Sequence, residues 1–277
     1  MRLNNRPQCA DEALERSPVN NRYENVMCWI RTGRGAQAMT TLEAWVDDNP
    51  SDESVRRMAA SAAEAICDWK RAAFHWKAVL DSGATDDMAR IGYAKACTQA
   101  GDAASAAPIW ATLCEQEPDC TARHIELARV YAKQNKLDEA ITAYANAAAT
   151  DAGNTTIWLE MGSLFARTSF YEEAISALRQ CVSIDPEHAF ARAVLADVYL
   201  QAGDTDSATN EARTSANHDV SLVLPQVILA QVEWLSGAAQ CATDRLDAVL
   251  PYAPEGPHTD RARALRQQCM QEERVAV

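Results

Sequence analysis

Apolar residues recur along the chain at the spacing of amphipathic helices. The clearest stripe places apolar or small residues at i, i+3, i+4 and i+7: Trp158, Met161, Gly162 and Phe165. A second stripe follows soon after it, at Ala174, Leu178 and Cys181. Each stripe forms one face of a helix, with polar residues between the apolar positions. The pattern therefore predicts two short helices joined by a tight turn.

This pair of stripes recurs with a period of 34 residues. Alanine marks the repeat at seven positions: Ala38, Ala72, Ala106, Ala140, Ala174, Ala208 and Ala242. When this alanine is numbered 20 in each unit, position 8 is small in six of seven units and position 24 is bulky in six. Small residues at positions 8 and 20 allow the two helix backbones to approach closely. A fixed period of this length indicates one supersecondary unit copied in tandem.

The turns are marked as well. Position 15, between the two helices, is Gly33, Cys67, Gly101, Asn135, Ser169, Gly203 and Gly237. Glycine and asparagine tolerate the left-handed conformation that ends a helix, so we expect the first helix to stop there. Position 32 is proline in alternate units: Pro50, Pro118, Pro186 and Pro254. Because proline cannot continue a helix, the chain turns again at this position.

These preferences resemble those of the tetratricopeptide repeat (TPR) family. One unit matches the family at Leu127, Ala128, Tyr131, Ala140 and Tyr144, and another matches it at Leu195, Ala196, Tyr199, Gly203, Asp204 and Ala208. The terminal units depart most, as expected for repeats that lack one neighbour. The resemblance implies an all-α fold, a right-handed α-solenoid (superhelix) of tandem TPR helix-turn-helix units.

The period also sets the expected organisation. Seven units occupy residues 19–256, with bounds at 19–52, 53–86, 87–120, 121–154, 155–188, 189–222 and 223–256. Residues 1–18 are expected to form a partly disordered lead-in. Residues 257–277 are expected to form a C-terminal capping helix and tail, since Ala262, Leu265 and Cys269 again fall on one helix face.

Composition narrows the function. A net charge of −13 disfavours nucleic acid as a partner, because a phosphate backbone demands an excess of Lys and Arg. No stretch reaches the roughly 18 apolar residues of a membrane span, and the first ten residues lack the apolar core of an export signal. The nine cysteines are scattered without a C-x-x-C pair, which favours reduced thiols and a cytoplasmic protein. We expect no metal and no cofactor.

Catalytic motifs are also missing. The sequence contains no P-loop, no G-x-S-x-G and no H-E-x-x-H, and its five histidines lack ligand spacing. His124 falls at a packing position and is interpreted as a core histidine. Seven units with short ends leave no room for a separate enzymatic domain, so we expect no catalytic residues and no enzyme.

Function is therefore expected on the surface that stacking creates. In the TPR family the first helices line a concave groove, and the resemblance implies two zones here. The first carries the cations Arg57, Lys95, Arg129, Lys133 and Arg167; the second carries the apolar residues Phe190, Val194, Leu224, Ile228 and Trp234. This surface predicts a scaffold or adaptor that binds a protein or peptide with an acidic stretch and an apolar anchor site at Trp234.

Several alternatives stay open at this stage. The C-terminal helix covers the apolar end of the groove in one reading and leaves it exposed in the other. A stably bound assembly or regulatory subunit, for example of a secretion or envelope-assembly apparatus, is the runner-up function. Self-association through the end units or the apolar end is a further possibility. The carboxylate clamp by which some TPR domains grip chaperone tails is absent, because Arg57 and Ser61 are followed by Gly92 and then by Ala122 and Glu126.

Overall fold

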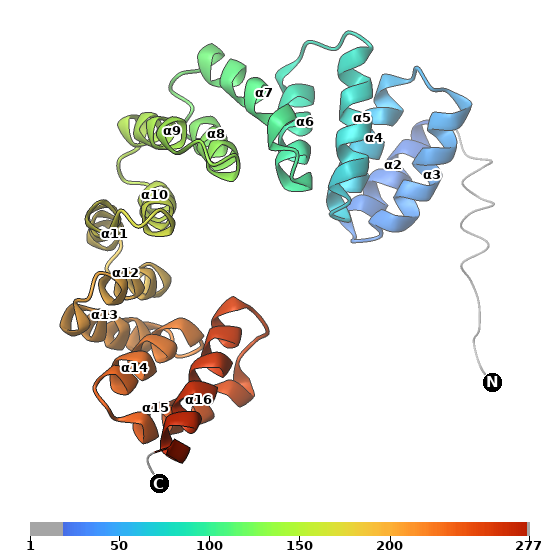
Figure 1. The fold of residues 1–277 in the computed structure, drawn as a ribbon. Coiled ribbons are helices and arrows are strands. Elements are labelled where there is room, and N and C mark those ends of the chain that lie inside the picture. Colours follow the sequence, from blue (N-terminus) through green and yellow to red (C-terminus); the bar gives the residue numbers. More distant parts are fainter. Residues whose placement is uncertain (1–18, 276–277) are drawn as a thin grey trace, which may run out of the picture. The chain divides into compact units, whose positions relative to one another are not determined.

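The computed structural model describes the backbone of residues 19–275 and the side chains of residues 25–271. The lead-in expected at 1–18 lies outside the described residues. Within them the chain forms α-helices and one short 3-10 helix, and no strand (Figure 1). The helices are α2 (Val19–Arg31), α3 (Gly35–Asp48), α4 (Glu53–Ala65), α5 (Trp69–Asp81), α6 (Asp87–Ala100), α7 (Ala103–Gln116), α8 (Thr121–Lys133), α9 (Leu137–Thr150), α10 (Thr155–Arg167), α11 (Tyr171–Ile184), α12 (Ala189–Gln201), α13 (Thr205–His218), α14 (Val223–Leu235), α15 (Ala239–Val249), η1 (Leu250–Tyr252) and α16 (Pro257–Val275).

The helices repeat with the period of the sequence. The even-numbered helices α2 to α14 each begin 34 residues after the previous one, and so do the odd-numbered helices α3 to α15. We call the even-numbered set the first helices and the odd-numbered set the second helices. A first helix, a tight turn and a second helix therefore recur in register, as the sequence predicts.

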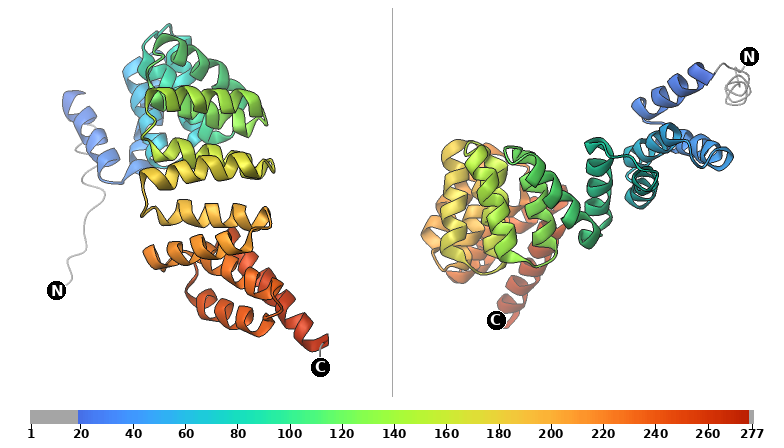
Figure 2. Two further views of the ribbon diagram at one scale, coloured as in Figure 1. Left: turned by 90° about the vertical axis from the view of Figure 1, so that its left-hand side faces the viewer. Right: turned by 90° about the horizontal axis from the view of Figure 1, so that it is seen from above.

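The chain divides into two compact units, Met1–Ala143 and Tyr144–Val277, with the division inside α9. In the first unit, each helix from α2 to α8 packs against the next, and first helices also contact each other (α2 with α4, α4 with α6). The second unit repeats this arrangement from α10 to α16, with α10 against α12 and α12 against α14. Figure 2 shows α10 to α13 stacked as successive layers.

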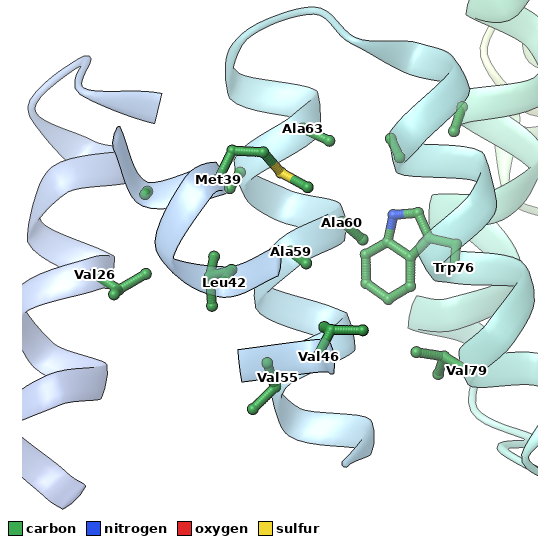
Figure 3. Close-up of a cluster of buried hydrophobic side chains, with 14 of the residues drawn as sticks. Val26, Met39, Leu42, Val46, Val55, Ala59, Ala60, Ala63, Trp76 and Val79 are labelled. Atoms are coloured by element: carbon green, nitrogen blue, oxygen red, sulfur yellow. The ribbon is translucent and has the colours of Figure 1, made fainter. Parts of the chain in front are cut away.

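The core lies between paired helices, where the repeat places its small residues. All seven alanines at position 20 have an exposed fraction of 0%. Position 8 is buried in each of the seven 34-residue repeats too, at Val26, Ala60, Ala94, Ala128, Gly162, Ala196 and Ala230. Figure 3 shows Val26, Leu42, Ala60 and Trp76 in one such cluster of α2 to α5. The predicted contact of small residues is therefore the contact that the structure uses.

The bulky residue at position 24 reaches across to a first helix. The indole of Trp76 donates to the Glu64 carboxylate at 2.7 Å, and the indole of Trp110 donates to the Thr98 hydroxyl at 3.2 Å. A Cβ atom on Gly92 would lie 2.4 Å from the Trp76 ring. The glycine is therefore needed to seat the indole, which satisfies its N–H while its ring stays buried.

The turn after each first helix adopts the predicted left-handed backbone. All seven residues at position 15 have a positive φ, between 58° and 87°. Four are glycines, and the others are Cys67, Asn135 and Ser169. Asparagine visits this region at little cost, whereas cysteine and serine are strained there.

Candidate partner-binding surfaces

In the first unit, Arg57 is held by carboxylates of the same unit. Its guanidinium donates to Glu53 at 2.8 Å and to Asp86 at 3.2 Å. The hydrogen bond from Arg57 lowers the pKa of the Asp86 carboxyl from its ordinary value of 3.8 to about 2. The same contact raises the pKa of Arg57. Arg57 therefore contributes little uncompensated charge to the surface.

The other three predicted cations of this unit also have partners. The Lys95 ammonium lies 3.8 Å from the Glu64 carboxylate, and Arg129 pairs with Glu126 at 2.5 Å. Lys133 donates to the backbone carbonyl of Thr98 at 2.9 Å. The basic zone expected on the first helices is therefore largely compensated by neighbouring acceptors, which sequence spacing alone did not show.

The second unit presents a different surface on α10 and α12. Arg167, at the C-terminal end of α10, is exposed and forms no ion pair with a residue that the structure describes. Phe190, near the start of α12, keeps 41% of its surface exposed. Leu159 and Val194 are half-buried and pack against the apolar cluster of this unit. We call Leu159, Arg167, Phe190 and Val194 the α10–α12 surface.

Two predicted groove residues belong to the core instead. Leu224 and Ile228 are 3% and 0% exposed. Both lie in the cluster that includes Tyr199 and Leu200 of α12. Apolar packing between α12 and α14 thus removes them from the surface, and we exclude them from the candidate site.

The C-terminal helix covers the apolar end of the second unit. Helix α16 packs against both α14 and α15, and its predicted stripe of Ala262, Leu265 and Cys269 is buried. Trp234 is half-buried and packs against the same cluster. Of the two alternatives that the sequence left open, the structure therefore shows the covered one.

Arg261 links α16 to the helices beneath it. It donates to the Asp197 carboxylate of α12 at 2.7 Å and to the Gln231 side chain of α14 at 2.7 Å. Position 9 of two successive first helices supplies these acceptors, so α16 lies along the first-helix side. Sequence analysis did not single out Arg261. The sequence feature that points to Arg261 is its place on the last helix, as a cation directly before the apolar stripe that begins at Ala262.

The described cysteines and histidines show no clustered chemistry. Burial raises the thiol pKa of Cys114 and Cys181, each to about 11. His124 is buried, with its Nε2 atom 2.8 Å from the Pro118 carbonyl oxygen, as expected for a core histidine. Across the described residues, no three His, Cys, Asp or Glu side chains are placed to hold a metal ion. No helix in the same range has the length and apolarity to cross a membrane.

Comparison with known proteins identifies the repeat. A family model described as tetratricopeptide repeat matches residues 98–161 and 171–221. These segments contain the two units that carry the sequence resemblance. These two segments of the chain are tetratricopeptide repeats. None of the curated protein sequences matches the chain.

Solved TPR structures share the fold. A tetratricopeptide repeat protein from Parabacteroides merdae superposes with a TM-score of 0.68 at 13% identity, covering 89% of this chain and 96% of that one. The C-terminal part of a TPR protein from Cytophaga hutchinsonii gives 0.64 at 10% identity, over 87% and 98%. YrrB, described as a TPR protein with an unusual peptide-binding site, gives 0.51 at 15% identity, over 66% and 95%. The predicted all-α solenoid class is thereby confirmed.

Proposed function

We propose that this TPR protein is an interaction scaffold or adaptor that binds a segment of a partner protein on the α10–α12 surface. The main support is that Phe190 is exposed on the first helix α12, while the nearby apolar residues Leu159 and Val194 pack against the core. An exposed aromatic ring beside half-buried aliphatic residues can bury a partner's apolar side chain. YrrB, which shares the fold and is described as having an unusual peptide-binding site, supports such a role.

The charges of this surface favour an acidic residue in the partner. Two carboxylates on the first helices of this unit are engaged, because Glu160 accepts from the Tyr144 hydroxyl at 3.0 Å and Asp197 accepts from Arg261. Arg167 remains as a cation without an ion pair among the described residues. A carboxylate can therefore pair with Arg167 without displacing another.

The dimensions suit a short extended segment. Arg167 holds position 13 of its repeat and Phe190 holds position 2 of the next, so they lie near opposite ends of adjacent helices. Eleven positions correspond to roughly 16 Å along a helix axis. An extended chain spans that length with about five residues. We therefore expect the acidic residue and the apolar anchor of the partner to be about five residues apart.

The first unit and the array as a whole have supporting roles in this proposal. Arg57, Lys95 and Lys133 contact acceptors outside their own helices, and Arg129 pairs with Glu126 within α8. We propose that seven repeats over residues 19–256 form the scaffold and that residues 257–277 cap it. We also propose a reducing compartment such as the cytoplasm, where the free described cysteines would remain thiols; fluorescence of a tagged chain in an oxidised compartment would contradict this.

Affinity capture with paired variants tests the site. The site variant is Arg167→Glu with Phe190→Ala. The control variant is Arg213→Glu with Phe170→Ala, which makes the same chemical changes at exposed residues of the second unit outside the first helices. A partner identified by mass spectrometry should bind the wild type and the control but not the site variant. Equal recovery on all three would overturn the proposed site, and recovery at fixed stoichiometry would favour the stably bound subunit.

A further inference from the structure

Helix α5 departs from the other second helices on its outward side. At position 22 the seven second helices carry Thr40, Phe74, Pro108, Thr142, Ser176, Asn210 and Asp244. Position 18 carries Ala36, Lys70, Ala104, Asp138, Glu172, Asp206 and Gln240. Only α5 has an aromatic residue at the first of these positions and a cation at the second. Because every repeat packs in the same way, equivalent positions are under the same packing constraint in each repeat. A residue type found at such a position in one repeat alone is therefore not explained by packing.

Phe74 lies on the side of α5 that faces away from the core. It has 65% of its surface exposed, whereas Trp76, two residues later, is buried. Two residues turn a helix by about 200°, so the two aromatic rings lie on opposite sides. Figure 3 shows Trp76 and Val79 in the buried cluster. The fold therefore buries Trp76 and leaves most of the Phe74 ring exposed, with a ring contact to His75 at 5.3 Å between centroids.

Two cavities lie on either side of Phe74. One, of ≈440 Å³, is bordered by α3 and α5 and includes Glu43 and Arg71 in its lining. The other, of ≈270 Å³, lies between α5 and α6, and its lining includes the apolar residues Tyr93, Cys97 and Ala100. Phe74 and Lys70 border both cavities. The smaller cavity offers an apolar floor to an inserted side chain.

Two of the three cations around Phe74 are available to a ligand, whereas Arg71 is paired with Glu43 and Asp68. Lys70 and Lys77 are exposed and form no ion pair within the described part of the chain. Lys77 borders the smaller cavity together with Lys70. Three carboxylates, of Glu43, Asp47 and Asp102, also line the two cavities. Glu43 pairs with Arg71 at 3.4 Å, and Asp102 accepts from the Ser105 backbone N–H at 3.1 Å. In a chain of net charge −13, the two lysines without an ion pair favour a partner that supplies carboxylates.

We propose that the outward side of α5 is a second docking surface, separate from the α10–α12 surface, for an acidic protein segment. A large apolar side chain enters the cavity over Tyr93 and Cys97, and contacts the Phe74 ring. Two carboxylates pair with Lys70 and Lys77. These lysines are seven residues apart, or roughly 10 Å along the helix. Extended backbone rises by about 3.3 Å per residue and turns every second side chain to the same face. The two acidic residues of the segment are therefore four positions apart, about 13 Å, with the apolar residue midway between them on the same face.

Phage display tests the proposal. The full chain is immobilised, and binders are selected from a library of random seven-residue peptides. The site variant is Phe74→Ala with Lys77→Ala. The control is Asn210→Ala with Arg213→Ala, at the same two repeat positions of α13. Since all four side chains are exposed, circular dichroism should show unchanged melting for both variants. Peptides selected on the wild type should carry the acidic–apolar–acidic spacing.

Binding of the selected peptides is then measured by fluorescence anisotropy. The dissociation constant should rise at least tenfold for the site variant, stay unchanged for the control, and rise with salt concentration. Peptides without the acidic pattern, or equal affinity for the site variant, overturn the proposal. Two other results would also overturn it. If the site variant mainly loses self-association in analytical sedimentation, the surface binds a second copy of the chain. If it mainly loses flotation with phosphatidylserine vesicles, the surface binds a membrane.

Discussion

Ala174 lies in the contact between α10 and α11, and its replacement by leucine tests the packing of the repeat. Ala174 is completely buried. On the facing helix, a Cβ atom added to Gly162 would lie 2.6 Å from Leu178 Cγ and 3.3 Å from the Ala174 carbonyl oxygen. The facing helices are therefore already too close for even one extra carbon at this point. A leucine at position 174 adds three.

The expected cost follows from this lack of space. Inserting extra carbons into a packed core destabilises a protein by about 1–3 kcal/mol. We expect Ala174→Leu at the upper end, about 3 kcal/mol, because the facing glycine has nothing to retract. For a unit of this size each kcal/mol lowers the melting temperature by about 2–4 °C. The melting temperature should therefore fall by about 6–12 °C.

Thermal unfolding followed by circular dichroism measures this shift. Ala248→Leu in α15 is the matched control, because Ala248 is an exposed alanine on a second helix of the same unit. Exposed substitutions usually change stability by less than about 0.5 kcal/mol. An equal fall for both variants would refute the assignment of position 20 to the contact between helices.

Three further changes test other parts of the account. Ser169→Gly should stabilise the chain by about 1 kcal/mol in urea unfolding, because the turn holds serine at a φ of 63°; no gain would argue against strain there. Asp86 has a folded pKa of about 2, below its ordinary 3.8, so its contribution to stability is present above pH 4 and is lost as the pH falls through 2. Asp86→Asn should therefore lower stability at pH 7 and weaken its fall between pH 4 and 2, and an unaltered acid titration would contradict the pair with Arg57. Arg261→Glu places a carboxylate beside Asp197, and should speed amide hydrogen exchange in α16 while leaving α10 unchanged; equal exchange in both proteins would show that Arg261 does not hold the helix.

The repeat itself was predictable because its cause is local. Ala174 and Gly162 are small wherever two helices meet, and Gly203 or Asn135 ends a helix by backbone preference alone. The period places such residues in register, so burial and positive φ follow from spacing. These features need no knowledge of how distant helices meet.

The surfaces were less predictable because they depend on contacts between repeats. Arg57 is paired with Asp86, 29 residues away, and Arg261 reaches Asp197 across 64 residues. Ile228 occupies a position that usually faces the groove, yet packing on α12 buries it. The exposed Phe74 was not predicted as a surface residue, because the groove positions lie on the first helices and Phe74 lies on the outward side of a second helix.

The central claim is that a partner segment binds the α10–α12 surface. Its most direct measurement is calorimetric titration of the captured partner segment against the wild type, the Arg167→Glu, Phe190→Ala variant and the Arg213→Glu, Phe170→Ala control. Removing an aromatic anchor and reversing a paired charge should weaken binding by at least about tenfold, or about 1.4 kcal/mol, with the control unchanged. Equal affinity for all three proteins would contradict the claim and place the partner elsewhere on the chain.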